Sequence, residues 1–252
     1  MSADWALLAG CPTGLDPQPG AAFDPARSGT CDIVGTPVVG IARGERDRML
    51  AEVPCGGYDP VMTTTDHLPY TGDPDADRLL VTEPMALLIG FVLDQQVPLQ
   101  KAFSGPRELK RRIGTVDART IAAMDPERLD AVFRERPALH RFPGNMARRT
   151  QELAAVIAER YGGDAARVWT EAKDARDLHQ RLLALPGIGP MKAGTLVAIL
   201  GKRLGVAPSG WEAFAPRHMT LGDVDSPEAL ARYQAGKRAF KAAQRAAAGD
   251  KS

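Results

Sequence analysis

The chain has 252 residues, of which 44% are hydrophobic, 25% charged and only 6% aromatic, and its formal net charge is +1. This composition is typical of a globular protein with one domain, or with one domain and an extension. No stretch approaches 18 consecutive apolar residues, which excludes a membrane-spanning helix. The first ten residues lack the basic lead-in and the apolar core of a secretory signal. Three cysteines without a Cys-x-x-Cys pair favour a reducing compartment, so we expect a cytoplasmic protein with no membrane partner.

Charge and composition change near residue 66. Residues 1–66 contain four Arg, no Lys and nine Asp or Glu, hence a net charge of −5, together with seven Pro and nine Gly. The remaining 28 basic and 22 acidic residues give residues 67–252 a net charge of +6. A segment of the first kind cannot bury enough apolar surface to offset its ordering entropy. We therefore expect residues 1–66 to be a poorly ordered acidic extension, and residues 67–252 to be the folded domain.

Two further observations concern this extension. Cys11, Cys31 and Cys55 all lie in it, and His67 follows. A zinc site from these four residues is an alternative, but their separations match no compact ligand knuckle, so we expect no metal site. Organised sequence begins shortly after Met62, which suggests a second hypothesis: translation starts at Met62, and residues 1–61 are not part of the native protein.

From Asp73 onward the sequence predicts successive helices with short connections, and no strand-like alternation is sustained. Residues 85–96 are apolar until their polar end and predict a buried helix entered through Pro84. Gly105-Pro106 predicts a break before a basic helix over residues 108–112. Residues 143–161 predict a long amphipathic helix that ends at Gly162-Gly163.

Polar residues mark the beginnings of the other helices. Asp117, Asp125 and Asp174 are typical N-cap residues. The third of these begins a helix expected to reach Leu185. A further helix should run from residue 190 to about 204, and a last one should begin at residues 225–228, with Asp225 as its simplest cap. The fold class that follows is all-α.

The most informative string is residues 185–193, Leu-Pro-Gly-Ile-Gly-Pro-Met-Lys-Ala. Gly187 and Gly189 permit positive φ and leave backbone N–H groups unshielded between two helices. These groups and the positive end of the second helix favour a phosphate. Ile188 should fix the turn to the core. A plain helical hairpin with a glycine turn is the alternative.

This string resembles the helix-hairpin-helix of the HhH-GPD superfamily of base-excision DNA glycosylases, which have a six-helix-barrel fold. The resemblance covers about residues 67–235 and has a second landmark. Members carry a polar residue, often Gln, at the end of an apolar helix, where it fills the gap left by the extruded base. Gln95 and Gln96 stand at that place, with Gln96 91 residues before Gly187. Residues 87–114 look like an actinobacterial-type branch of the superfamily.

The resemblance implies a base-excision repair protein that binds lesion-containing double-stranded DNA as a monomer, in the cytoplasm with the nucleoid. It implies a monovalent cation at the hairpin but no required cofactor, and the lack of cysteines after residue 55 predicts no iron–sulfur cluster. The residues that the resemblance assigns to DNA binding are Gly187, Ile188, Gly189, Met191, Lys192, Gln95 and Gln96.

The chemistry implied is cleavage of the N-glycosidic bond after extrusion of the nucleotide into a pocket. A carboxylate is wanted to stabilise the cation-like sugar or to activate water. The superfamily places this aspartate about twenty residues after the hairpin, but residues 190–211 contain no acid. The candidates are Glu212, the nearest, and Asp225, while Asp223 is a further acid in the same stretch.

The position of the lyase lysine in bifunctional members is occupied by Met191, with Lys192 one step further around the helix. We therefore expect Lys192 to contact a phosphate or solvent, and the enzyme to be monofunctional. The alternative is a non-catalytic protein that binds lesions or DNA structures and has lost the aspartate. Use of the hairpin in protein contacts is a third hypothesis, which leaves the Gln pair without a purpose.

Other residues fit DNA binding without requiring it. Three basic groups stand out, each of which is also explained by a solvated helix face: Arg107 with Lys110, Arg111 and Arg112; Arg148 with Arg149; and Lys237, Arg238, Lys241 and Arg245. His140, His179 and His218 show no metal-ligand spacing and are interpreted as surface or pocket residues. Trp169 is expected in the core. Trp211 follows a Pro-Ser-Gly turn and either stacks on an extruded base or plugs the core.

Overall fold

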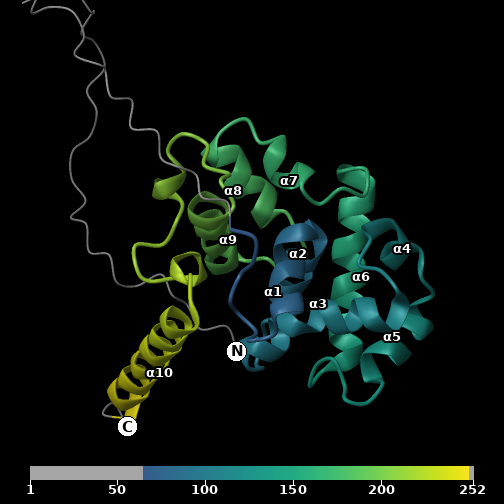
Figure 1. Ribbon diagram of the computed structural model, residues 1–252, viewed down its shortest axis with the longest axis horizontal. Coiled ribbons are helices and arrows are strands. Elements are labelled where there is room, and N and C mark those ends of the chain that lie inside the picture. Colours follow the sequence, from purple (N-terminus) through teal and green to yellow (C-terminus); the bar gives the residue numbers. More distant parts are fainter. Residues whose placement is uncertain (1–64, 250–252) are drawn as a thin grey trace, which may run out of the picture. The chain divides into compact units, whose positions relative to one another are not determined.

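The computed structural model describes residues 65–249, and this part of the chain is all-α, with helices and no strand (Figure 1). The predictions for residues 1–64, including the cysteines, the zinc alternative and the start at Met62, fall outside the described residues. The elements are α1 (Pro74–Thr82), α2 (Pro84–Leu93), α3 (Leu99–Ile113), α4 (Ala118–Ala123), α5 (Pro126–Arg134), α6 (Pro143–Arg160), α7 (Arg167–Thr170), α8 (Ala175–Leu183), α9 (Pro190–Arg203), the 3-10 helices η1 (Trp211–Ala213) and η2 (Leu221–Asp223), and α10 (Pro227–Gly249).

Local signals begin several helices where the sequence predicts. The side chains of Asp117, Asp125 and Asp174 each accept a hydrogen bond from the backbone N–H of the residue three positions later, at 2.8–2.9 Å. These bonds satisfy N–H groups that have no partner inside the helix. The three predicted N-caps are confirmed.

Helix α2 is the centre of the core. Every residue of α2 except Pro84 is buried, and α1, α3 and α6 pack against it. In Figure 1 this helix stands between the α8–α9 pair and α6. Gly90 allows α3 to approach closely, because a Cβ atom added there would lie 2.7 Å from Cδ1 of Phe103. Trp169 is in the core, as expected.

The break predicted at Gly105-Pro106 is wrong. Helix α3 runs through both residues, with Pro106 inside it, although proline removes one hydrogen bond of the helix. Both residues are buried, and a Cβ atom at Gly105 would lie 2.4 Å from Cδ1 of Leu93. Tight packing of α3 on α2 therefore outweighs the local cost of the proline.

The residues before α1 form a strap across the domain. Tyr70 is fully buried, and its hydroxyl donates to the Leu221 carbonyl of η2 at 2.7 Å. The Leu68 N–H donates to the Asp77 carbonyl at 3.1 Å, and the Thr65 N–H donates to the Arg203 carbonyl at the end of α9, also at 3.1 Å. The strap thus joins the first described residues to the last third of the chain.

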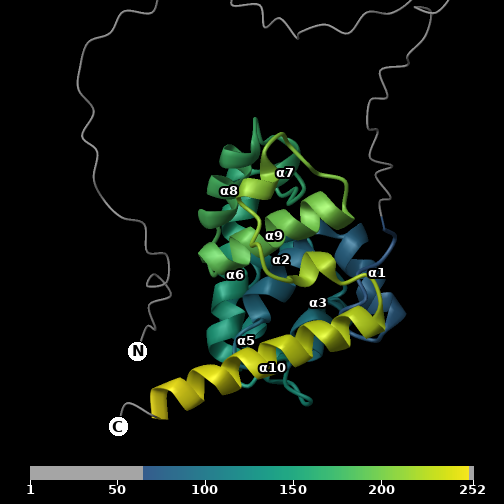
Figure 2. The ribbon, with the colours of Figure 1, turned by 90° about the vertical axis from the view of Figure 1, so that its left-hand side faces the viewer.

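The last helix leaves the body of the domain. Beyond the buried residues Ala229 and Leu230, the described side chains of α10 are half-buried or exposed, and the helix extends past the others (Figure 2). Its first turn is capped by Ser226, whose Oγ accepts the Ala229 N–H at 3.2 Å. Asp225 is exposed beside it, so its predicted capping role is wrong. No helix within residues 65–249 is both long and apolar enough to cross a bilayer.

Candidate functional site

The C-terminal end of α2 is capped by groups from two parts of the chain. The helix ends at Leu93, three residues earlier than predicted, and its last carbonyls need partners. The carbonyls of Gly90, Phe91, Val92 and Leu93 accept, in this order, the Asp94 N–H at 3.0 Å, the Lys192 Nζ at 2.6 Å, the Gln95 Nε2 at 3.0 Å and the Gln95 N–H at 2.7 Å. A lysine distant in sequence and the first glutamine of the pair thus complete the cap.

The backbone N–H and carbonyl of Gln95 and both polar atoms of its side chain have hydrogen-bond partners. Its Oε1 accepts Nη1–H of Arg149 at 2.7 Å, and its backbone carbonyl accepts from Nε2 of His140 at 2.9 Å. Nδ1 of His140 accepts the Phe142 N–H at 3.0 Å, which places the ring proton on Nε2. Gln95 therefore fixes the turn after α2 rather than reaching outward.

His140 is only 1% exposed, so its interpretation as a surface or pocket residue is wrong. Burial lowers the pKa of His140, and the positive charges of Lys101 and Arg141 lower it further. The neutral ring is the form that both of its hydrogen bonds require. His140 is thus a structural link between the turn after α2 and the entry of α6.

Gln96 differs from Gln95 in both exposure and backbone conformation. Its side chain is exposed, and its φ of 57° is the only positive value outside glycine in the described part of the chain. A left-handed conformation is costly for a residue with a Cβ atom and persists only where its surroundings enforce it. The turn therefore presents one glutamine to solvent on a firmly held backbone.

The predicted hairpin lies against the last turn of α2. Gly187 has φ of 80°, and a Cβ atom there would lie 3.4 Å from Cγ2 of Val92 in α2. Ile188 is 4% exposed, so it fixes the turn to the core as predicted. Gly189 has φ of −89° and precedes α9 without a side-chain cap, while Met191 is 56% exposed. Only one of the two glycines uses a positive φ.

Lys192 joins the hairpin to α2. Its Nζ lies 2.6 Å from the Phe91 carbonyl and 3.4 Å from the Gly187 carbonyl. Burial lowers the pKa of Lys192; the Arg149 charge also lowers it, while the Asp94 carboxylate acts in the opposite direction. The structure thus places the ammonium on carbonyl groups, where the sequence predicted phosphate or solvent.

The same contact bears on the expected monovalent cation. The Gly187 carbonyl already faces an ammonium, and the Leu185 carbonyl accepts the Ile188 N–H at 3.2 Å. A second positive charge beside Lys192 would be repelled, so the Gly187 side of the hairpin does not fit a cation. The cation stays a prediction for the remaining carbonyls.

An exposed aromatic residue that was not predicted from the sequence follows His140, which bonds to the turn. Phe142 is 42% exposed, and its backbone N–H is held by His140, which also holds Gln95. The Arg141 guanidinium lies 4.8 Å from the centre of its ring. The available signal was a large aromatic residue between an arginine and the Pro143-Gly144 helix start.

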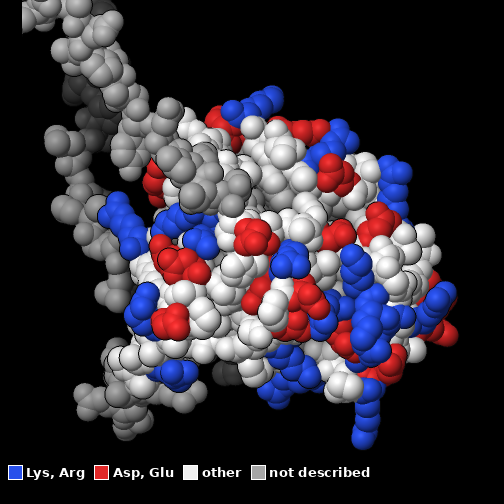
Figure 3. All heavy atoms as spheres, in the orientation of Figure 1, with Lys and Arg blue, Asp and Glu red and all other residues white. Residues whose placement is uncertain are grey.

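The first basic group is neutralised within the protein. Arg107, Lys110 and Arg111 form ion pairs with carboxylates at 2.5–3.1 Å. The Arg112 side chain is 1% exposed and donates to the Val132 carbonyl in α5 and to the Glu135 and Pro137 carbonyls that follow it. Figure 3 shows basic and acidic atoms intermixed over α1 and α3, without one continuous basic area.

Three cations near the C-terminal end of α2 differ from this group. Arg141, Arg149 and Lys192 form no ion pair with a carboxylate within residues 65–249. Arg148, in contrast, lies 3.8 Å from Glu152. The side chains of Lys241 and Arg245 fall outside the described ones, and Lys237 lies over the Tyr233 ring at 5.2 Å.

The predicted catalytic acids lie on the segment after α9. Glu212, in η1, and Asp225, before α10, are both exposed. Neither has a hydrogen bond or an ion pair that connects it to the turn after α2 in the described part of the chain. Trp211 packs over Gly201 of α9, where a Cβ atom would lie 2.7 Å from the indole, which favours the core-plug interpretation.

Asp223, the third acid of that stretch, is structural. It accepts the Thr220 N–H at 2.8 Å in a capping box of η2 and pairs with Lys202. Burial alone would raise the pKa of Asp223, but the bonds from Lys202 and Thr220 prevail and lower it. Its lone pairs are committed to these partners.

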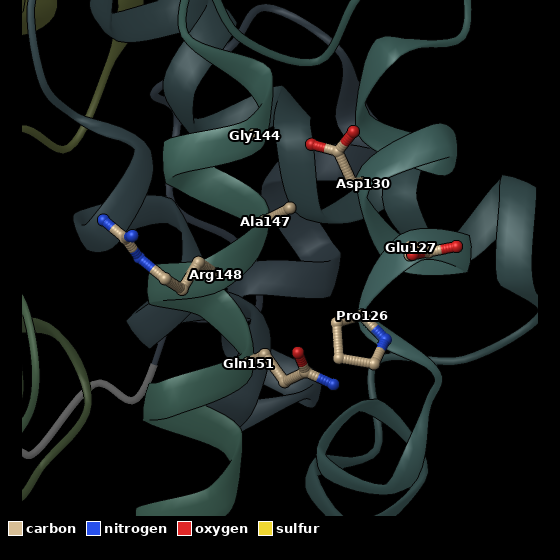
Figure 4. A pocket seen from close by; sticks show the side chains of 7 residues that line it. All are labelled: Pro126, Glu127, Asp130, Gly144, Ala147, Arg148 and Gln151. Carbon is tan, nitrogen blue, oxygen red and sulfur yellow. The ribbon is translucent and has the colours of Figure 1, made fainter.

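Two surface hollows lie elsewhere. One, of about 350 Å³, lies between α5 and α6, with Glu127 and Asp130 on one side and Gly144 and Gln151 on the other (Figure 4). The Nε2 of Gln151 donates to the Met124 carbonyl at 2.6 Å, so this amide is already bonded within the protein. The other lies between α1 and α3, beside the neutralised basic group. None of the residues that the resemblance assigns to DNA binding, and neither of the candidate acids Glu212 and Asp225, lines either hollow.

The comparisons with known proteins assign no family. No protein-family model matches the chain, and no curated protein sequence matches it.

Proposed function

We propose that the domain binds double-stranded DNA and excises a damaged or mismatched base by monofunctional N-glycosylase chemistry. The DNA would lie on a surface that we call the hairpin–turn face, formed by Gln96, Arg141, Phe142, Gly189 and Met191. The observation that carries the proposal is that the hairpin packs on the last turn of α2, through Gly187 beside Val92 and the bond from Lys192 to the Phe91 carbonyl. The exposed Gln96 follows the end of this helix three residues later.

The hairpin suits a phosphate. The backbone N–H groups of Gly189, Met191 and Lys192 open α9, where no side-chain cap occupies them. Pro190 lacks an N–H, and the dipole of a helix longer than three turns adds positive potential at this end. Arg141 and Arg149, which are not neutralised by carboxylates, would add attraction for the backbone of the DNA.

The turn suits the gap that an extruded nucleotide leaves. Gln96 offers both a donor and an acceptor to the unpaired base opposite, on a backbone that the α2 cap holds in place. The Phe142 ring offers a stacking surface for an unstacked base. Extrusion costs a few kcal/mol, which rigid side chains that fill the gap would partly offset.

A binding experiment with the full chain tests the proposal. Fluorescence anisotropy with a labelled duplex should show weaker binding for Arg141→Ala and Phe142→Ala, and a slope of log affinity against log salt that is smaller by about 1 for Arg141→Ala. Arg111→Ala is the matched control, because this exposed arginine is already paired with Glu108. Equal losses for Arg111→Ala and Arg141→Ala would reject the hairpin–turn face.

Catalysis is tested on the same duplexes. End-labelled DNA carrying alkylated, oxidised, deaminated or mismatched bases is incubated with the protein and then treated with alkali. Strand breaks at one lesion class are expected. Lesion-dependent binding without breaks would instead assign the alternative function, a non-catalytic lesion-binding protein.

A further inference from the structure

Asp94 stands where local electrostatics disfavour an acid. It is the C-cap residue of α2 and is half-buried. The C-terminus of a helix carries partial negative charge, so cations are favoured there and carboxylates are not.

The Asp94 carboxylate is also uncommitted. Its backbone N–H caps Gly90, but no hydrogen bond or ion pair of its side chain occurs within residues 65–249. Its charge acts on the Lys192 ammonium, which is already held by the Phe91 carbonyl. Two residues later, Gln96 has its costly left-handed backbone. Local rules are thus broken twice within three residues, which is expected at functional positions.

We propose that Asp94 is the carboxylate that serves cleavage of the N-glycosidic bond, an inference that rests on the proposed function. Water would attack C1′ of the sugar while the C1′–N bond breaks and its electron pair leaves on the base nitrogen. Asp94 stabilises the positive charge that develops on the sugar and accepts the proton that water loses. This proton passes to the departing base, so the products are a free base and an abasic sugar with a C1′ hydroxyl.

The position of Asp94 distinguishes it from the other acids. It precedes Gln95 and Gln96 in the turn that would occupy the gap in the DNA, beside the Lys192 link to the hairpin. Asp223 is committed to Thr220 and Lys202. Glu212 and Asp225 lie on the segment that follows α9, without a recorded bond to this turn.

The test compares Asp94→Asn with wild type in the full chain. Under single-turnover conditions, the rate of alkali-sensitive strand breaks should fall by about 100-fold or more, as for loss of a general base. Affinity for the same duplex should be equal or higher, because a negative charge is removed from a surface that faces phosphates. The midpoint of thermal unfolding should also be equal or higher, because the helix end no longer carries the opposed charge.

Glu135→Gln is the matched control, since it removes an acid from the C-cap of another helix, α5, and should leave the rate of base release unchanged. An Asp94→Asn rate within about threefold of wild type would overturn the inference and leave the proposed function intact. Loss of activity in Glu212→Gln or Asp225→Asn, with Asp94→Asn active, would reassign the carboxylate. Binding without base release by wild type would overturn the inference alone, and no binding to any duplex would overturn both.

Discussion

Replacing Lys192 by Met tests the link between the hairpin and α2. The change keeps an unbranched apolar side chain but removes the donor to the Phe91 carbonyl. No other group among residues 65–249 bonds to this carbonyl, because the Gln95 N–H donates to the Leu93 carbonyl instead. The bond is charge-assisted and short, at 2.6 Å. We expect Lys192→Met to lower the free energy of unfolding.

Two opposing effects set the magnitude. A hydrogen bond from a charged group contributes about 1.5–3 kcal/mol, and an unpaired buried carbonyl costs about 1–3 kcal/mol. Relief of the buried ammonium, whose desolvation is visible in its lowered pKa, returns part of this. The expected net loss is about 2 kcal/mol, which corresponds to a decrease in melting temperature of about 4–8 °C for a domain of this size.

The difference should also depend on pH. Because burial lowers the pKa of Lys192 in the folded state, the unfolded chain holds more protons between that lowered pKa and the ordinary lysine value. Wild type should therefore gain stability relative to Lys192→Met as pH rises through this window. Below it, the group is charged in both states and the difference should be constant.

Thermal melts of the full chain, followed by far-UV circular dichroism from pH 7 to 10, provide the measurement. Lys202→Met is the control on the same helix, since its partly exposed pair with Asp223 should contribute less than about 1 kcal/mol. Equal midpoints for wild type and Lys192→Met would refute the argument that this lysine completes the cap of α2.

Three other predictions concern single residues. Burial lowers the pKa of His140 in the folded state, so as pH falls the unfolded chain takes up this proton before the folded protein does. Wild type should therefore lose stability as pH falls from about 6.5. Thermal melts between pH 7.5 and 5 should show that His140→Gln lacks this part of the pH dependence. Arg112→Met removes a buried guanidinium from three carbonyls and Glu108 and should cost about 3–5 kcal/mol in urea denaturation, against less than about 1 kcal/mol for the exposed Arg111→Met. Gly187→Ala should destabilise by about 1–2 kcal/mol because of its positive φ, whereas Gly189→Ala should cost less than about 1 kcal/mol; equal calorimetric midpoints would contradict the assigned backbone conformations.

The parts of the fold that the sequence predicts correctly are those with local causes. The caps at Asp117, Asp125 and Asp174 involve a side chain and an N–H three residues away, so spacing alone identifies them. The burial of Ile188 follows in the same way from a single apolar residue between two glycines. The all-α class rests on the same kind of local pattern.

The errors have distant causes. Helix α2 ends at Leu93 because Lys192 and His140 stabilise the turn that follows, and neither is visible from the sequence of α2. Helix α3 continues through Pro106 because Gly105 packs on Leu93. The arginines at residues 107–112 look like a phosphate-binding group until their acidic partners are located in space. The two glutamines of the turn are equivalent in the sequence, and only the structure shows that one is occupied and the other exposed.

The strap formed by residues 65–70 has a practical consequence for truncated forms of the protein. Leu68 and Tyr70 are fully buried, and the Tyr70 hydroxyl donates to the Leu221 carbonyl of η2, 151 residues later in the chain. A recombinant fragment that begins at Met62 retains all of these contacts. One that begins at Asp73 keeps every described helix but exposes the apolar surface that the Tyr70 ring covers in the intact domain. This fragment should therefore be expressed in inclusion bodies or be rapidly proteolysed.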